Sequence, residues 1–456
     1  MRVLIVAANQ EHKPDPVVPL GAAFVAGAAR SAGHDVCLLD ACFEGEEFPV
    51  RLEETLRRFE PQVVGVSLRN IDNTAWPHAM SYLPAYRRLM ATLRQTSPSA
   101  CVVLGGSAFT LMPEALMADL TPDFGVIGPG EAAFAALLAD ISAGRRGKTR
   151  GADFQNCLLR GEQYPAEPVR PAWDLLDLDK YYSRGGALNV QTKRGCAFTC
   201  NYCTYPLLEG SVSVGQDVTL AVDELERLAG ASGARHFFVV DNTFNMPHDH
   251  AVAFCERLAA RKLDLEWTAY VTPRGMTPGL ARMMAAAGCR SVELGTDAGA
   301  LETLRGLGKS FGIDDIKQAS TALKSAGIKF SHCLIMGGPG ETAATLAQTV
   351  ECIVATEPDF VIAMLGVRVY PRTRIARTLE RQGWIGRERI GLDPVFYIDP
   401  AVRDLLVPFA LDTRKQRSNW YFPGLEGDRW LRYWRRQRQL GARGPLWALR
   451  PAAVSQ

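Results

Sequence analysis

The chain has 456 residues, enough for two or three domains, and 47% of them are hydrophobic while 22% are charged. This is the profile of a globular protein with a large core. The net charge of +2 neither requires nor excludes an acidic partner. No apolar run reaches the about 20 residues that a membrane span needs, and the first residues do not form a secretory leader. We therefore expect a cytoplasmic protein without a membrane span.

The first 145 residues alternate between short apolar runs and helical patterns. Such alternation predicts a doubly wound parallel sheet, an α/β fold whose ligands bind at the carboxyl ends of the strands. The expected strands are 2–8, 35–40, 63–68, 101–106 and 124–128. The expected helices are 20–32, 47–58, 78–96, 113–118 and one that follows the Gly-Pro-Gly-Glu at 128–131.

The regular alternation of strands and helices stops after this first domain, which we place at 1–145. Residues 146–186 contain Pro165, Pro168 and Pro171 and show no sustained period, which is typical of a linker. Six strand–helix units then follow and predict a partial barrel over 187–385. The expected strands are 188–192, 236–242, 265–271, 291–296, 329–337 and 360–370, and the expected helices are 217–230, 248–262, 277–287, 313–326 and 341–355.

The last segment, 386–456, is rich in Trp and Arg. Basic residues with interleaved aromatic residues occur in proteins that bind single-stranded nucleic acid. We favour instead a small helical extension that packs Trp430 and Trp434 on the barrel and leaves its arginines in solvent. No nucleic-acid partner is therefore predicted.

Three cysteines follow the first barrel strand at a spacing that suits a metal cluster: Cys196, Cys200 and Cys203. A cubane of four irons has four corners, so three thiolates leave one iron open to another ligand. Open metal sites are those that receive substrates. A zinc site would need a fourth ligand, and no histidine lies within this loop. Eleven cysteines, an odd number, also argue against a disulfide framework.

At these residues the sequence resembles the radical SAM superfamily, whose CxxxCxxC signature follows the first strand of a partial six-stranded barrel. The resemblance implies a [4Fe–4S] cluster that binds S-adenosylmethionine (SAM) and cleaves it reductively. It also implies an external one-electron donor such as flavodoxin or ferredoxin. By position in the motifs, the residues expected to bind SAM are Tyr202, Asp241, Asn245, Glu293, Gly337, Gly338 and Pro339.

The first domain resembles that of the cobalamin-binding branch of this superfamily. The similar stretches are 19–40, the Ser-Leu-Arg-Asn at 67–70, the Gly-Gly-Ser at 105–107 and the Gly-Pro-Gly-Glu at 128–131. The resemblance implies that cobalamin is bound by Ser67, Leu68, Arg69, Asn70, Gly105, Gly106, Gly130 and Glu131.

One motif of that branch is missing. Many cobalamin domains carry Asp-x-His-x-x-Gly, whose histidine ligates cobalt, and this chain has none. By its position Arg69 would lie near the lower face of cobalamin, where it cannot coordinate because a guanidinium has no free lone pair. The alternative is that Arg69 forms a surface salt bridge with Asp72.

The function predicted from this resemblance is methylation of an unactivated carbon of a small molecule, such as a natural-product, lipid or peptide intermediate. One alternative is a radical rearrangement or cyclisation without methyl transfer. Another is an iron–sulfur redox sensor without turnover. A relative of the methylthiotransferases, with Cys37, Cys42 and Cys101 holding a second cluster, is a further alternative. No motif identifies a catalytic side chain or the substrate.

Overall fold

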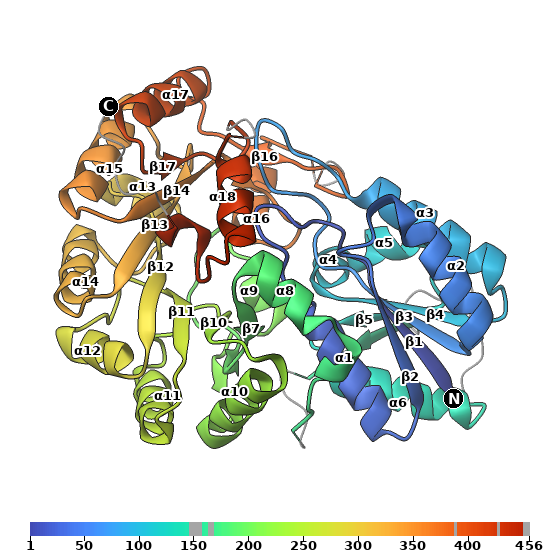
Figure 1. The fold of residues 1–456 in the computed structure, drawn as a ribbon. Coiled ribbons are helices and arrows are strands. Elements are labelled where there is room, and N and C mark those ends of the chain that lie inside the picture. Colours follow the sequence, from blue (N-terminus) through green and yellow to red (C-terminus); the bar gives the residue numbers. More distant parts are fainter. Residues whose placement is uncertain (146–156, 163–167, 387–389, 426–428, 450–456) are drawn as a thin grey trace.

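The computed structural model describes residues 1–145, 157–162, 168–386, 390–425 and 429–449. Two parallel sheets lie side by side, one from each half of the chain, and the last helices pack beside the second sheet (Figure 1). This arrangement confirms the predicted fold class. In the described part of the chain, no helix is both long enough and apolar enough to cross a bilayer.

The first sheet has the order β2-β1-β3-β4-β5-β6, and all its strands are parallel. The strands are β1 (Arg2–Ala7), β2 (Asp35–Asp40), β3 (Val63–Ser67), β4 (Cys101–Gly105), β5 (Phe124–Ile127) and β6 (Leu158–Arg160). The helices are α1 (Leu20–Ser31), α2 (Phe48–Phe59), α3 (Leu83–Thr96), α4 (Ser107–Leu111), α5 (Pro113–Leu120) and α6 (Glu131–Ser142). Helices α1 and α6 cover one face while α2 and α3 cover the other (Figure 1). Both faces are thus buried, which explains the continuously apolar strands.

Two elements of this half differ from expectation. Strand β6 comes from the predicted linker and pairs with β5, because its residues 158–160 lie in register with Gly125–Ile127. Helix α3 begins at Leu83 rather than at 78, since the preceding residues form a turn in which the Asn73 side chain accepts from the Met80 amide. The predicted linker residues 146–156 and 163–167 lie outside the described residues.

The second sheet has the order β7-β10-β11-β12-β13-β14-β17 and is also parallel throughout. Its strands are β7 (Leu188–Val190), β10 (His236–Val239), β11 (Glu266–Val271), β12 (Cys289–Asp297), β13 (Lys329–Met336), β14 (Phe360–Leu365) and β17 (Trp420–Tyr421). The helices of this half are α8 (Leu178–Gly185), α9 (Tyr205–Leu208), α10 (Val218–Ser232), α11 (His248–Arg261), α12 (Pro278–Ala286), α13 (Leu301–Gly306), α14 (Ile313–Ser325), α15 (Ala343–Ala355) and α16 (Arg374–Arg381). Six strands confirm the partial barrel, and the seventh comes from the extension.

The predicted strand 360–370 is interrupted. Gly366 has a φ of 70°, a left-handed conformation that ends β14 and turns the chain. The next two residues form β15 (Val367–Arg368), which pairs antiparallel with β16 (Phe396–Tyr397). A second small antiparallel pair, β8 (Lys193–Arg194) and β9 (Val214–Gly215), flanks the cysteine loop.

The extension contains α17 (Leu406–Gln416), β17 and α18 (Arg429–Gln439). The predicted packing is confirmed: the rings of Trp430 and Trp434 lie 5.8 and 6.3 Å from that of Phe360 on β14. Three arginines of α18 are exposed: Arg432, Arg435 and Arg436. Arg438 is the exception, because it is buried and pairs with Asp15 at 2.7 Å. The extension therefore contacts both halves of the protein.

Candidate functional site

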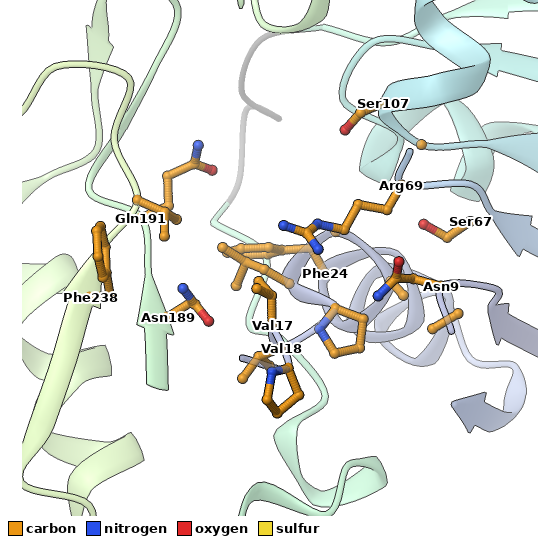
Figure 2. Close-up of a pocket in the computed structure, with 18 of the residues that line it drawn as sticks. Asn9, Val17, Val18, Phe24, Ser67, Arg69, Ser107, Asn189, Gln191 and Phe238 are labelled. Atoms are coloured by element: carbon orange, nitrogen blue, oxygen red, sulfur yellow. The ribbon is translucent and has the colours of Figure 1, made fainter. Parts of the chain in front are cut away.

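A cavity of about 700 Å³ lies between the two sheets. Its wall on the first domain comes from the carboxyl ends of β1, β3 and β4, and its wall on the barrel comes from β7, β10, β11 and β12. Figure 2 shows Asn9, Ser67 and Ser107 on one side and Asn189, Gln191 and Phe238 on the other. The ligand-binding edges of both sheets thus face one shared space.

Most of the residues predicted to bind cobalamin line this cavity: Ser67, Arg69, Gly105, Gly106, Gly130 and Glu131. Leu68 and Asn70 do not line it. Leu68 is buried against the β4 end, where its amide donates to the Gly105 carbonyl at 2.9 Å. The Asn70 carbonyl accepts from the Tyr86 hydroxyl. Gly106 has a φ of 91°, and a side chain there would collide with the Leu68 backbone, so this turn requires glycine.

Arg69 extends from the end of β3 into the cavity (Figure 2). The alternative pairing with Asp72 is wrong, because Asp72 is fully buried and binds Arg368 at 2.8 Å. Within the described residues Arg69 forms no ion pair. Burial raises the pKa of Tyr205 in the opposite wall to about 12, and the positive charge of Arg69 acts to lower it. A cation therefore faces the space between the domains.

The cysteine loop runs from Cys196 to Cys203, between β8 and α9. Gly195 has a φ of 81°, which explains the glycine directly before the first cysteine. Cys196 is buried, while Cys200 and Cys203 are partly exposed. Burial raises the pKa of both Cys200 and Cys203, that of Cys203 to about 12. Negative charge on Cys196 raises the pKa of both thiols further, and negative charge on Cys200 also raises that of Cys203. The three thiols are thus close enough to influence one another.

In the described ranges, no three His, Cys, Asp or Glu side chains converge as the ligands of a single metal ion do. A cubane places its irons at separate corners, so its thiolates need not converge on one point. Three neighbouring thiols without a fourth cysteine in the loop fit a cluster with one open iron.

The alternative second cluster at Cys37, Cys42 and Cys101 does not fit. Cys37 lies in β2 and Cys101 in β4, and β1 and β3 separate these strands. With neighbouring strands about 4.8 Å apart, the two cysteines are about 14 Å apart across the sheet. They cannot share a cluster.

Two polar side chains hold the cysteine loop in place, and the sequence alone did not single them out. Asn201 donates through its side chain to the Gly306 carbonyl at 2.7 Å and through its amide to the Leu307 carbonyl at 2.9 Å. Glu209 accepts from the Gly195 amide at 3.1 Å and from the Gln191 side chain at 2.8 Å. Glu209 lies in a Cys-Thr-Tyr-Pro-Leu-Leu-Glu-Gly stretch at 203–210, and its closeness to Cys203 is the one sequence signal that could have indicated it.

An ion pair across the domain boundary was also missed. Arg194, two residues before Cys196, binds Glu131 at the start of α6 with a nitrogen–oxygen distance of 2.5 Å. Their side chains are 7% and 4% exposed, and the guanidinium also lies 5.2 Å from the Phe24 ring centre. Glu131 is thus already engaged by the barrel, so its carboxylate links the domains.

Three residues predicted to contact SAM have partners within the protein. The Tyr202 hydroxyl donates to Asp297. Asp241 is fully buried and accepts from the Thr192 amide at 2.7 Å and the Thr192 hydroxyl at 2.6 Å. The Asn245 amide group donates to the Thr272 carbonyl at 3.0 Å. Neither Asp241 nor Asn245 lines the cavity, because each is used to tie the barrel strands together.

Glu293 does line the cavity, as a ligand-binding residue would. Burial raises its pKa, while hydrogen bonds from Trp447 at 3.0 Å and from Cys333 act in the opposite direction. Trp447 belongs to the extension, and no motif indicated that it would reach this site.

The glycine-rich loop after β13 holds Gly337, Gly338 and Pro339 outside the cavity wall. The Gly337 amide donates to Glu341 at 3.1 Å, so the loop folds back on itself. A side chain on Gly338 would approach Leu307, which follows α13, to 2.9 Å. Close packing beside the cysteine loop therefore accounts for this glycine.

Comparison with known families gives the class of protein that this fold and site define. The family profile described as B12 binding domain matches residues 11–138, and that of the radical SAM superfamily matches residues 190–353. The chain belongs to the cobalamin-binding radical SAM proteins. The predicted family and its cofactors, a [4Fe–4S] cluster, SAM and cobalamin, are confirmed.

Within that class the chain is similar to methyltransferases. It is 24% identical over 450 residues to the tryptophan 2-C-methyltransferase of Streptomyces laurentii, covering 83% of this chain and 74% of that one. It is 27% identical over 394 residues to the uncharacterized methyltransferase PH0819 of Pyrococcus horikoshii, covering 82% of each. The fold matches that of the radical SAM methyltransferase TsrM from Kitasatospora setae with a TM-score of 0.85 at 23% identity, over 98% of this chain and 96% of that one.

Proposed function

We propose that the protein is a cobalamin-dependent radical SAM methyltransferase that methylates a carbon of a small molecule held in the interdomain cavity. The observation that carries this proposal is the shared cavity. It is lined at once by the strand ends of the B12-binding domain and by those of the radical SAM barrel. A substrate between them is accessible from both sides.

Cys196, Cys200 and Cys203 would hold the cluster, and the strand ends of the first domain would hold cobalamin. When bound, the cluster supplies one electron to cleave SAM, and cobalamin supplies the methyl group. The protein's own contribution is positioning. Arg194 and Glu131 hold the cysteine loop against the first domain, and the extension covers the cavity, so that reacting groups are oriented and water is excluded.

On the cobalamin side, Ser67, Gly105, Gly106 and Gly130 would contact the corrinoid through the backbone or small side chains. Arg69 would present a positive charge to it without coordinating the metal. On the SAM side, Glu293 would accept hydrogen bonds from the ligand, and Tyr202 would bound the site beside the cysteines. Asp241, Asn245 and the glycine-rich loop would shape the site from behind.

We propose that this activity takes place in the cytoplasm. Eleven cysteines, an odd number, argue against a disulfide framework, as is typical of proteins in a reducing compartment.

The test is to purify the protein anaerobically with cobalamin supplied, reconstitute the cluster and measure iron and corrinoid in the same sample. About four irons and one corrinoid per chain are expected. Incubation with SAM, reductant and candidate substrates should then yield S-adenosylhomocysteine along with a methylated product. A preparation with iron but no corrinoid under these conditions would contradict the proposal.

Cyclisation without methyl transfer is the second candidate. The chain is 27% identical over 392 residues to the anaerobic magnesium-protoporphyrin IX monomethyl ester cyclase of Rubrivivax gelatinosus, covering 79% of this chain and 66% of that one. Formation of 5′-deoxyadenosine without S-adenosylhomocysteine would favour this candidate.

A further inference from the structure

Helix α16 presents a positively charged face beside the cysteine loop. It begins after Thr373, whose hydroxyl accepts from the Ala376 amide, and it buries Ile375, Ala376 and Leu379. Its outer face carries Arg374, Arg377 and Arg381, all exposed. These positions are three, four and seven residues apart, so their side chains lie on one side of the helix.

This helix is attached directly to the cysteine loop. The Ile375 amide donates to the Asn201 carbonyl at 2.9 Å, and Asn201 lies between Cys200 and Cys203. Asn201 also donates to the Gly306 carbonyl at the end of α13. Arg374 directly precedes Ile375, and the exposed Arg305 directly precedes Gly306. Each arginine is therefore next in sequence to a residue that is hydrogen-bonded to Asn201.

The four arginines are available to a partner. Within the described residues, none of Arg305, Arg374, Arg377 and Arg381 forms an ion pair. The same two helices carry only two acidic residues, Glu302 and Glu380, so the surface has an excess of positive charge. Ala197 and Thr199 of the cysteine loop are also exposed, so the loop reaches the surface here.

We propose that this arginine surface, defined as Arg305, Arg374, Arg377 and Arg381, docks an acidic one-electron carrier protein of the flavodoxin type. The charges are complementary to such a partner, and the surface lies next to the residues that would hold the cluster. In the transfer the reduced carrier loses one electron and the cluster gains it, and no bond forms or breaks. The inference rests on the proposed function, because it takes the cluster as the electron's destination.

The test compares the charge-reversal variant Arg374→Glu/Arg381→Glu with wild type and with Arg51→Glu/Arg58→Glu. The control pair has the same spacing of seven residues on an exposed face of α2, in the first domain. Two quantities are measured with reduced flavodoxin as the probe: its Kd for each protein, and the rate of cluster reduction. Dithionite, a small reductant that needs no docking surface, serves as the second reductant.

We expect the α16 variant to bind flavodoxin about tenfold or more weakly and to be reduced by it correspondingly more slowly at low salt. The difference should shrink at high salt, because screening weakens long-range attraction. Reduction by dithionite and the control variant should match wild type.

Unchanged flavodoxin binding in the α16 variant, or an equal loss in the control variant, would overturn the docking site. A slower reaction with dithionite as well would also overturn it, since it would indicate damage to the cluster environment. Failure of every protein to assemble a cluster would instead contradict the proposed function, while the binding measurement would still test the surface.

Discussion

Replacing Glu131 by Gln tests whether the buried ion pair with Arg194 holds the two domains together. At 2.5 Å and an effective dielectric constant of 20, the attraction of two unit charges is about 7 kcal/mol. Desolvation of both ions offsets most of it. Removing only Glu131 leaves Arg194 charged and buried, which typically costs about 3–5 kcal/mol. The Gln191 side chain and the Phe24 ring still face the guanidinium, so we expect the lower end, about 3 kcal/mol.

The assay is urea unfolding of the cluster-free protein, followed by tryptophan fluorescence, together with iron retention after reconstitution. Asp72→Asn is the matched control, because Asp72 and Arg368 form a buried ion pair between the same two halves. Both variants should lose stability. Only Glu131→Gln should also retain less iron, because Arg194 directly precedes Gly195 and Cys196. A free energy of unfolding for Glu131→Gln within about 0.5 kcal/mol of the wild-type value would refute this prediction. An equal loss of iron from Asp72→Asn would also refute it.

Three further changes probe the cluster, the cavity and the extension. Cys200→Ala should abolish the absorbance near ~400 nm of the reconstituted cluster and all SAM cleavage, because a thiolate ligand is lost. Arg69→Ala should change the absorption spectrum of bound corrinoid and leave the iron content unchanged, because it removes the positive charge from the cavity. Asp15→Asn should alter the pH dependence of stability: burial raises the pKa of Asp15 to about 6, with Arg438 acting to lower it. The folded protein thus holds this proton more tightly than the unfolded chain. The stabilisation of the folded state that comes from this proton is complete below about pH 4 and is lost as the pH rises through 6. Between pH 4 and 7 the free energy of unfolding of wild type, measured in urea, should therefore fall by about 2–3 kcal/mol relative to that of the variant.

Each of these has a contrary result. Retained SAM cleavage by Cys200→Ala would remove that cysteine from the ligand set. An unchanged corrinoid spectrum in Arg69→Ala would show that the guanidinium does not influence the cofactor. Parallel stability curves for wild type and Asp15→Asn would show that the folded and unfolded pKa of Asp15 are alike.

The strands of both sheets were predictable because parallel strands covered on both faces leave a continuous apolar run in the sequence. Elements with little apolar content were not. Strand β6 spans three residues in an irregular segment, and β17 only two, so neither produces a detectable pattern. The break at Gly366 was hidden because apolar residues continue on both sides of it.

The site was predictable where chemistry dictates a local spacing. The three cysteines are close in sequence, and Gly195 beside them is required by its backbone conformation. Contacts between residues far apart in the sequence produce no local spacing that could be recognised. Glu131 and Arg194 are 63 residues apart, and Glu293 and Trp447 are 154 apart, so only the folded chain brings each pair together. The assignment of Asp241 to the SAM site stays a prediction, and the sequence could not show that the Thr192 amide and hydroxyl already donate to both of its carboxylate oxygens.

The wall that Trp447 contributes to the cavity sets an order of events during biosynthesis. Residues as early as Ile5 and as late as Trp447 line the same space. The first domain and the cysteine loop emerge from the ribosome well before the extension does, so their walls of the cavity can fold before Trp447 is in place. The wall beside Glu293 exists only once the C-terminal extension has folded against the barrel and Trp447 donates to the Glu293 carboxylate. Until then the space between the two sheets lacks the wall that Trp447 provides in the folded protein.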